Sequence, residues 1–138
     1  MRILLDTHVL LWALKGTDGD GEAFPPDVKN LLSDGKNEIF YSSVNIFEIE
    51  IKRLVRPKDK LPSGEELIRL SNEAGFIPLS LRSEHTLLME SLQRGEEVKD
   101  HKDPYDWLLI SQAKSEKMMF LTHDSKLKKY LEDCIIGF

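Results

Sequence analysis

The stretch from His101 to Asp124, HKDPYDWLLISQAKSEKMMFLTHD, constrains the fold more than any other part of the chain. Pro104 suits the first position of a helix, because proline lacks the N–H group that would be left unpaired there. Asp103 is then the N-cap, whose side chain accepts from the N–H groups of the first turn. Asp106 falls at the third helical position. The apolar stripe of this helix consists of Leu109, Ile110 and Ala113, and the helix ends in the polar run 114–117.

A buried strand follows this helix over residues 118–121, an apolar run without polar alternation. Such a run is typical of a parallel strand that is covered on both faces. Thr122 and Asp124 come directly after it. In open α/β sheets, sites form in the crevice outside the carboxyl ends of the strands. Asp106 and Asp124 are therefore expected where such folds carry out chemistry.

The rest of the chain alternates short apolar runs with helical segments. Strands are expected at 3–5, 39–41, 76–79 and 134–136, and helices from Thr7, from Asp27 to Asp34, after Ser42 or Ser43, from Gly64 to Ala74, from a cap at Ser83, and from Ser125 to Tyr130. This alternation predicts a three-layer α/β/α domain with a mostly parallel central sheet of four to five strands. We expect residues 1–138 to form this single domain. The DGDGE run in the loop 17–26 does not fit a calcium loop, because Ala23 stands where glycine is required.

Glu48 lies within an apolar stripe of its helix. That stripe consists of Val44, Phe47, Ile51, Leu54 and Val55, at helical spacing. A carboxylate on a core-facing stripe is costly unless it is paired, protonated or bound to a metal. Glu50 lies off the stripe and has no predicted role.

Four acids are predicted to meet at one crevice. Asp6 follows the first strand and Asp124 follows the strand 118–121, so the two acids end at the same edge if these strands are neighbours. Asp106 and Glu48 can reach that edge from their helices. Carboxylates repel by roughly 4 kcal/mol per close pair at an effective dielectric constant near 20. Such a cluster indicates a hard cation, and oxygen ligands favour Mg²⁺ or Mn²⁺ over zinc.

Each acid also has a simpler interpretation. Asp6 and Asp103 could cap their helices, and Asp124 could be a turn residue. Asp106 could complement the helix dipole, a contribution of roughly 0.3–1 kcal/mol. The joint arrangement favours the metal site over four separate structural roles.

Composition excludes several classes of protein. The chain has 41% hydrophobic and 31% charged residues, which is typical of a globular protein. A net charge of −5 argues against coating nucleic acid by bulk charge. The single cysteine, Cys134, cannot form an internal disulfide, and no apolar run is long enough for a membrane span. We expect a cytoplasmic protein without membrane association.

Three segments together resemble the PIN-domain nucleases, and within them the VapC-type toxins of bacterial toxin–antitoxin pairs. These are ILLDTHVLLW from Ile3, SSVNIFEIEIK around Glu48, and HKDPYDWLLISQA…FLTHD, and the resemblance extends to about Tyr130. It implies Mg²⁺- or Mn²⁺-dependent endoribonuclease activity, an RNA substrate, and a cognate antitoxin that covers the site. A homodimer is left open.

The resemblance also assigns the site residues. The four acids of the family fall on Asp6, Glu48, Asp106 and Asp124, with Thr122 beside the last of them. These four are the predicted catalytic and metal-binding residues. Asp103, which matches a subgroup whose helix opens with DPxD, is a secondary candidate together with Thr122 and Thr7.

Other functions fit the residues less well. Haloacid-dehalogenase-like phosphatases require an acid two residues after the nucleophile, where this chain has His8. Receiver domains phosphorylate an aspartate after a middle strand, whereas Asp6 follows the first. A PIN-like RNA- or protein-binding module without catalysis is the remaining alternative, and intact acids argue against it.

Histidines and lysines near the acids are candidates for contacts with substrate phosphate. His8, His101 and His123 flank the acids in sequence, and local hydrogen bonding is the simpler role for each. The run KRLVRPKDK, from Lys52 to Lys60, and a group of three lysines after Asp124 could each follow a phosphate backbone or simply be solvated. That group consists of Lys126, Lys128 and Lys129.

Overall fold

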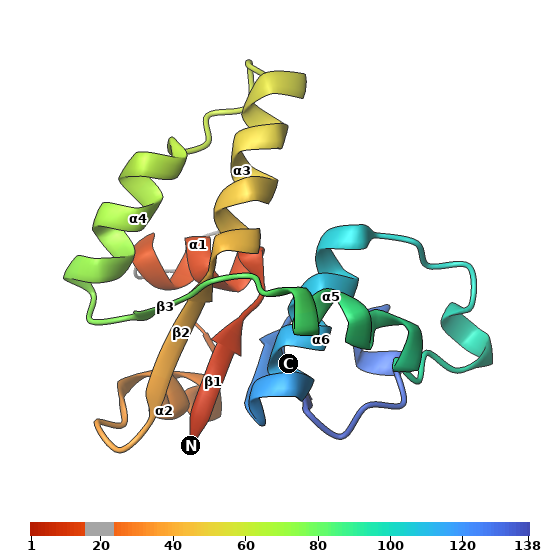
Figure 1. Ribbon diagram of the computed structural model, residues 1–138. Helices are drawn as coiled ribbons and strands as arrows, with labels where there is room; N and C mark the ends of the chain where they lie inside the picture. The colour runs from red at the N-terminus through yellow and green to blue at the C-terminus, as the bar shows by residue number, and fades with distance from the viewer. Residues whose placement is uncertain (16–23) are drawn as a thin grey trace.

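The computed structural model describes residues 1–15 and 24–138 and has an α/β fold built on a five-stranded, all-parallel sheet (Figure 1). The strand order is β3-β2-β1-β4-β5. The strands are β1 (Arg2–Leu5), β2 (Glu38–Ser42), β3 (Ile77–Leu79), β4 (Met119–Thr122) and β5 (Ile135–Gly137). The predicted fold class is confirmed, with every strand parallel.

Six α-helices and three short 3₁₀ helices connect these strands. They are α1 (Thr7–Lys15), α2 (Pro26–Ser33), α3 (Ser43–Val55), α4 (Gly64–Glu73), α5 (Ser83–Leu87), α6 (Pro104–Glu116), η1 (Leu88–Ser91), η2 (Glu96–Val98) and η3 (Leu127–Lys129). None of the helices in the described part of the chain is long and apolar enough to cross a membrane. The DGDGE run and most of its loop lie outside the described residues.

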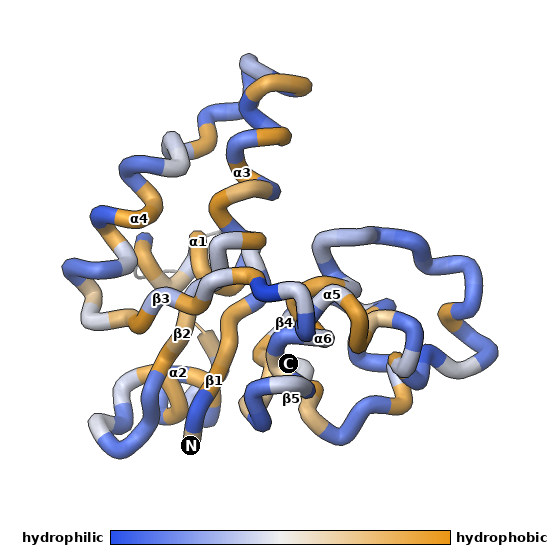
Figure 2. The backbone as a smooth tube through the Cα atoms, in the orientation of Figure 1, coloured by the Kyte–Doolittle hydropathy of each residue, from blue (hydrophilic) through white to orange (hydrophobic). Residues whose placement is uncertain are grey.

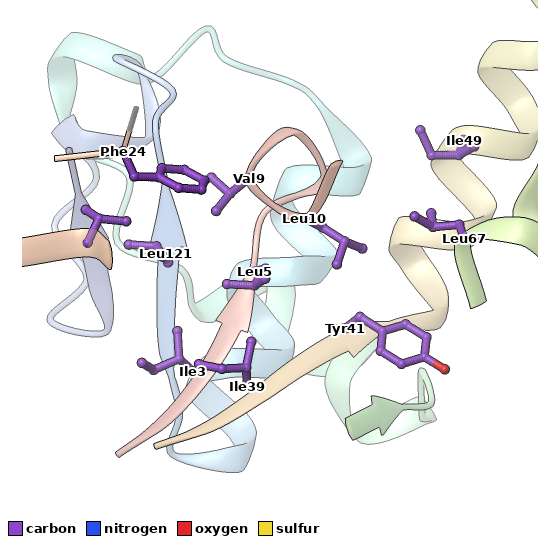
Figure 3. Close-up of a cluster of buried hydrophobic side chains, with 11 residues drawn as sticks. Ile3, Leu5, Val9, Leu10, Phe24, Ile39, Tyr41, Ile49, Leu67 and Leu121 are labelled. Atoms are coloured by element: carbon purple, nitrogen blue, oxygen red, sulfur yellow. The ribbon is translucent and has the colours of Figure 1, made fainter. Parts of the chain in front are cut away.

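The sheet is buried on both faces, because successive residues of each central strand belong to different hydrophobic clusters. Ile3 and Leu5 pack with apolar residues of α1, α2, α3 and α4 (Figure 3). Leu4, between them, packs in the second cluster with Leu109 and Ile110 of α6. Alternation of side chains along a strand thus gives three layers from a continuous apolar run.

Helix α6 begins as its sequence predicts. The Asp103 side chain accepts hydrogen bonds from the N–H groups of Tyr105 at 2.9 Å and Asp106 at 3.2 Å, and Pro104 occupies the first helical position. The helix ends at Lys117, whose φ of 56° is left-handed. The predicted apolar stripe of α6 is fully buried.

Helix α3 buries a different face from the predicted one. Val44 and Glu48 are buried as expected, but Phe47, Leu54 and Val55 are 55%, 78% and 71% exposed. The reason is visible in Figures 1 and 2: α3 and α4 extend beyond the sheet, so the far end of α3 has apolar residues but no layer to cover them. Ser42 caps this helix by accepting from the N–H of Val44 at 2.9 Å.

Glu50, which had no predicted role, ties α3 to the start of α4. Its Oε1 accepts from the N–H of Gly64 at 2.6 Å and from Arg53 Nη1 at 3.0 Å. The hydrogen bond from Gly64, followed by that from Arg53, lowers the pKa of Glu50. A Cβ at Gly64 would lie 2.8 Å from Glu50 Oε1, so glycine is required for this close approach.

Two predicted local structures are wrong. Arg82, rather than Ser83, is the N-cap of α5, and its N–H donates to Nδ1 of His85 at 2.9 Å. The predicted helix from Ser125 to Tyr130 is reduced to the single turn η3. The side chain of Asp124 accepts from the N–H of Lys126 at 2.7 Å, which favours a turn over a regular helix at this position.

The parallel pairing of β1 with β4 creates the edge at which the acids meet. Leu5 is the partner of Leu121, and the N–H of Asp6 donates to the carbonyl of Leu121 at 3.0 Å. From β1 the sheet continues through β2 and β3 on one side, and through β4 and β5 on the other. The strand order therefore reverses direction between β1 and β4, which is the switch point of the sheet. Ligand sites in open α/β sheets form at such a point, outside the carboxyl ends of the strands.

Two leucine substitutions test the burial of α3 and α4. Leu67 of α4 is fully buried, so Leu67→Ala should lower the free energy of unfolding by roughly 2–5 kcal/mol through lost contacts and a cavity. Leu54→Ala removes the same atoms from the exposed end of α3 and should change the free energy of unfolding by less than about 0.5 kcal/mol. Urea denaturation measures both. A large loss in Leu54→Ala would mean that the predicted stripe is covered after all.

Candidate active site

A cavity of about 220 Å³ brings the four predicted acids together. It is lined by Asp6, His8, Trp12, Glu48, Lys52, Asp103, Asp106, His123 and Asp124. The acids come from four elements that are distant in sequence: the end of β1, the middle of α3, the first turn of α6 and the segment after β4. Their assembly depends on the sheet order rather than on any local motif.

Asp6 is held by hydrogen bonds to both of its carboxylate oxygens. The N–H of Thr7 donates to Oδ1 at 2.7 Å, and Oγ1 of Thr122 donates to Oδ2 at 2.6 Å. Burial raises the pKa of Asp6, and these two hydrogen bonds act in the opposite direction. The two hydrogen bonds therefore fix the orientation of the Asp6 side chain, while burial makes its negative charge unfavourable.

Thr7 connects Asp6 to Glu48. Its hydroxyl donates to Oε1 of Glu48 at 2.7 Å and accepts from Nδ2 of Asn45 at 2.9 Å. The other oxygen of Glu48, Oε2, forms an ion pair with Lys52 Nζ at 2.7 Å. Glu48 is thus paired, which is one of the three conditions under which a buried carboxylate is tolerated.

Thr122 connects Asp6 to Asp124 in the same way. While its hydroxyl donates to Asp6, it accepts from the N–H of Asp124 at 3.0 Å. Asp124 itself is exposed, at the rim of the cavity. The two threonines that were secondary candidates therefore brace three of the four acids.

Asp106 has a strongly perturbed carboxyl group. Its pKa rises from the ordinary 3.8 to about 9, first because of burial and then because of the negative charges of Asp6, Asp103, Glu48 and Asp124. Its Oδ2 lies 3.3 Å from Nε2 of His101. The strongest repulsion in the cluster is thus concentrated on the residue at the start of α6.

The histidines that flank the acids in sequence do not share one position. His8 and His123 line the cavity, whereas His101 lies behind Asp106 and lines an adjoining open groove. That groove continues from Asp103, Asp106 and Asp124 to Lys102, Ser125 and Lys126. Of the two predicted basic segments, Lys52 borders the cavity and Lys126 borders the groove.

Two residues of the site were missed by reasoning from sequence. Trp12 lines the cavity, with its ring 5.5 Å from that of His123 and 6.2 Å from that of His8. Asn45 orients Thr7 and also accepts from the N–H of Ser42 at 2.7 Å. Trp12 could have been identified from its spacing to His8, four residues away on the same helix face. Asn45 could have been identified from the capping pattern that it forms with Ser42.

The chain matches the PIN domain family over residues 3–132, and the cavity holds carboxylates where the resemblance predicted the acids of that family. The chain belongs to the PIN domain family. PIN domains are a family of metal-dependent nucleases. No curated protein gave a significant match to the chain.

Solved structures with this fold include three VapBC complexes. VapBC2 from Rickettsia felis, bound to a DNA fragment from its promoter, matches with a TM-score of 0.66 and 17% identity over 100% of this chain and 99% of that chain. DNA-bound VapBC from Salmonella typhimurium matches with a TM-score of 0.65 and 14% identity over 99% and 98%. VapBC-1 from nontypeable Haemophilus influenzae matches with a TM-score of 0.60 and 14% identity over 94% and 92%. At these identities the likeness establishes the fold of the PIN domain.

The residues of the cavity fit a hard divalent cation. Most of their potential donors are carboxylate oxygens, which Mg²⁺ and Mn²⁺ prefer, and the remaining ones are the imidazoles of His8 and His123. Asp106 lies in a concentration of negative charge that a cation would relieve. Within the described residues, no three of these acids have ligand atoms within 4.8 Å of one another, so a cation held here would keep some of its waters as ligands.

In the part of the chain that the structure describes, a compact group of potential ligands lies elsewhere, in Glu84, His85 and Glu116. The buried His85 accepts the N–H of Arg82 at Nδ1, so its proton lies on Nε2 and points to Glu116 at 2.9 Å. A protonated nitrogen cannot ligate a metal ion. The group is therefore a hydrogen-bonded link between α5 and α6.

The raised pKa of Asp106 predicts how the stability of the metal-free protein depends on pH. The folded state holds a proton on this carboxyl up to about pH 9, whereas the unfolded state releases it near pH 3.8. Protonation of Asp106 in the folded state contributes fully to the free energy of unfolding below pH 3.8. This contribution is lost as pH rises toward 9, by at most about 1.4 kcal/mol per pH unit.

Asp106→Asn should flatten this decline, because the amide does not titrate. Urea denaturation in chelator at pH 5, 7 and 9 measures it, with the exposed Asp133→Asn as the control that keeps the wild-type slope. Parallel curves for wild type and Asp106→Asn would show that Asp106 is ionised throughout.

Proposed function

We propose that residues 1–138 form a single-domain, metal-dependent endoribonuclease, the toxin of a VapC-type toxin–antitoxin pair that acts in the cytoplasm. The observation that carries this proposal is the meeting of Asp6, Glu48, Asp106 and Asp124 in one cavity at the switch point of a PIN sheet. Membership of the PIN family supports nuclease chemistry. The VapBC complexes with the same fold support the toxin assignment.

Three acids of the cavity would hold Mg²⁺ or Mn²⁺, directly or through water: Asp6, Asp106 and Asp124. A bound divalent cation supplies Lewis acidity, which lowers the pKa of water and stabilises the oxygen that leaves the phosphorus. Thr7 and Thr122 keep Asp6 in one orientation through the hydrogen bonds to its two oxygens. A fixed carboxylate loses less entropy on binding a cation than a mobile one.

Glu48 is suited to orienting the attacking water or to completing the metal ligands. Its Oε1 already accepts from Thr7, and its Oε2 is neutralised by Lys52. The ammonium makes this carboxylate a weaker base, and the negatively charged phosphate of a substrate is a competing partner for Lys52. We therefore assign Lys52 to substrate phosphate and Glu48 to water.

RNA reaches the acids along the groove beside the cavity. Lys102 and Lys126 line this groove together with Asp103, Asp106 and Asp124. Lysines at the border of an acidic site can bind the phosphates on either side of the bond that is cleaved, which offsets the repulsion between the acids and the RNA backbone. Asp103, which caps α6, contributes through that cap rather than as a ligand.

Substitution of Asp106 tests the chemistry. Asp106→Asn keeps the size of the side chain but removes a negative charge, and loss of a ligand should reduce Mg²⁺-dependent RNA cleavage at least about 100-fold. Asp103→Asn should preserve the cap and most of the activity. Cleavage is measured on a fluorescent single-stranded RNA with Mg²⁺, with Mn²⁺ and with chelator, and circular dichroism checks the fold. Full activity in Asp106→Asn would contradict the proposed site, and wild-type activity in chelator would contradict the need for metal.

The proposed antitoxin has two features to recognise. An arginine or lysine from another chain can neutralise the acidic cavity. The exposed Phe47, Leu54 and Val55 on α3 offer an apolar surface for the segment that carries it. Phe47 also packs edge-on to Tyr105 of α6, with ring centroids 5.7 Å apart, so this surface is continuous with the first turn of α6.

Growth assays test the toxin assignment. Expression of the chain alone in a bacterial host should slow growth, because cleavage of cellular RNA stops protein synthesis. Co-expression of a small protein encoded in the adjoining reading frame should relieve the effect. Asp6→Asn should be harmless at the same expression level. If Asp6→Asn slows growth as much as the wild type does, the toxicity arises outside this cavity.

A further inference from the structure

A chain of polar contacts, two of them hydrogen bonds, reaches Asp106 from behind, through residues that do not line the acidic cavity. Trp107 Nε1 lies 3.0 Å from the hydroxyl of Tyr130, and this hydroxyl lies 2.6 Å from Nδ1 of His101. Nε2 of the same imidazole lies 3.3 Å from Oδ2 of Asp106. The chain thus starts and ends on neighbouring residues of α6, and it passes through the segment before that helix and the residue after η3.

The chemistry of the first donor decides the direction of one of these hydrogen bonds. The indole of Trp107 can only donate, so the Tyr130 oxygen accepts from it. The single proton of the Tyr130 hydroxyl is then available to His101 Nδ1, which can accept it when the ring proton lies on Nε2. A neutral imidazole that accepts at Nδ1 carries its proton on Nε2. Nε2 lies 3.3 Å from Asp106 Oδ2, a polar contact that is longer than the two hydrogen bonds before it.

The surroundings hold this imidazole in place. Tyr130 is 5% exposed and packs in the second hydrophobic cluster, and its ring stands edge-on to that of His101 at 5.7 Å. Arg94 donates to the carbonyl of His101 at 3.1 Å and lies over the ring of Trp107 at 5.2 Å. The donor that faces Asp106 therefore belongs to a packed part of the protein rather than to a mobile surface.

We propose that His101 is a positioning residue, which donates from Nε2 to Asp106 and so fixes the orientation of this carboxylate for a divalent cation. Tyr130 and Trp107 set the hydrogen-bonding direction of His101. The proposal rests on the proposed function, because Asp106 has a metal to hold only if the cavity is a metal site. It adds three residues to the site that neither the four-acid pattern nor the cavity lining contains.

The physical role of this chain is to order the Asp106 carboxylate. Asp106 is buried in a cavity lined by other acids, where an oriented donor favours one position of its side chain. An oriented N–H stabilises the carboxylate without bringing a full positive charge that would repel the cation. Outer-shell hydrogen bonds to metal ligands commonly account for 10- to 100-fold in metal affinity.

The first experiment observes the imidazole directly. Two-bond ¹H–¹⁵N spectra of the ¹⁵N-histidine-labelled, Mg²⁺-loaded protein identify which nitrogen of His101 carries the proton. We expect Nε2 protonated and Nδ1 bare in the wild type, and a loss of that preference in Tyr130→Phe. A proton on Nδ1, or protons on both nitrogens, would overturn the proposal.

The second experiment measures Mn²⁺ affinity by titration calorimetry. His101→Ala and Tyr130→Phe should each weaken binding, His101→Ala by about 10-fold or more. His101→Gln should retain most of the affinity, since its amide N–H can replace Nε2–H. His85→Ala is the matched control: His85 is also buried and bonded to a carboxylate of α6, but at Glu116, at the other end of that helix. It should bind Mn²⁺ as the wild type does.

The outcomes separate this proposal from the one on which it rests. If the wild type binds Mn²⁺ and the folded Tyr130→Phe and His101→Ala proteins bind it within twofold of the wild type, the positioning role of His101 is overturned and the metal site stands. Equal losses in His85→Ala and His101→Ala would also overturn it, because the effect would then be general destabilisation. If the wild type itself binds no Mn²⁺, both proposals fail.

Discussion

The parallel pairing of β1 with β4 is the contact on which the rest of the structure depends. It joins Ile3 to Met119 and Leu5 to Leu121, and it closes the middle of a sheet whose residues are buried on both sides. Because the two strands run in the same direction, the residues that follow them emerge at one edge, and these residues are Asp6 and Thr122 with Asp124. The helices that cover the sheet contribute the other two acids from opposite layers. Without this pairing Asp6 would be an ordinary helix cap.

The carboxylates at this edge repel one another, and the fold stabilises each of them in a different way. Asp6 receives two hydrogen bonds, Glu48 receives a hydroxyl and an ammonium, and Asp124 is left in contact with solvent. Asp106 is buried among the charges of the other acids, and burial followed by these charges raises its pKa to about 9. An arrangement that leaves one carboxylate so unfavourable is typical of a functional site, since a purely structural cluster could have replaced that acid without loss.

Sequence reasoning was most accurate where local chemistry decides the structure. The cap at Asp103, the proline that follows it and the apolar strand after α6 are all present as predicted, and the four acids meet in one cavity. It was wrong at the far end of α3, because apolar spacing shows which residues share a helix face but not whether another layer covers that face. It gave no role to Glu50, because that role depends on where α4 begins against α3. It missed Trp12 because the contact with His123 depends on the placement of the segment after β4. Whether the acids act in catalysis remains a prediction.

The register of β1 against β4 also determines when the site can exist. Ile3 and Met119 are partners, so β1 can pair with β4 only after more than a hundred further residues have been synthesised. When β1, β2 and α3 have been synthesised, the chain contains Asp6 and Glu48. It still lacks α6, which carries Asp106, and Thr122, whose hydroxyl donates to Asp6. A nascent chain therefore has no acidic edge until β4 and Asp124 have left the exit tunnel. Under the proposed function, this order of assembly keeps each ribosome safe from the chain it is making.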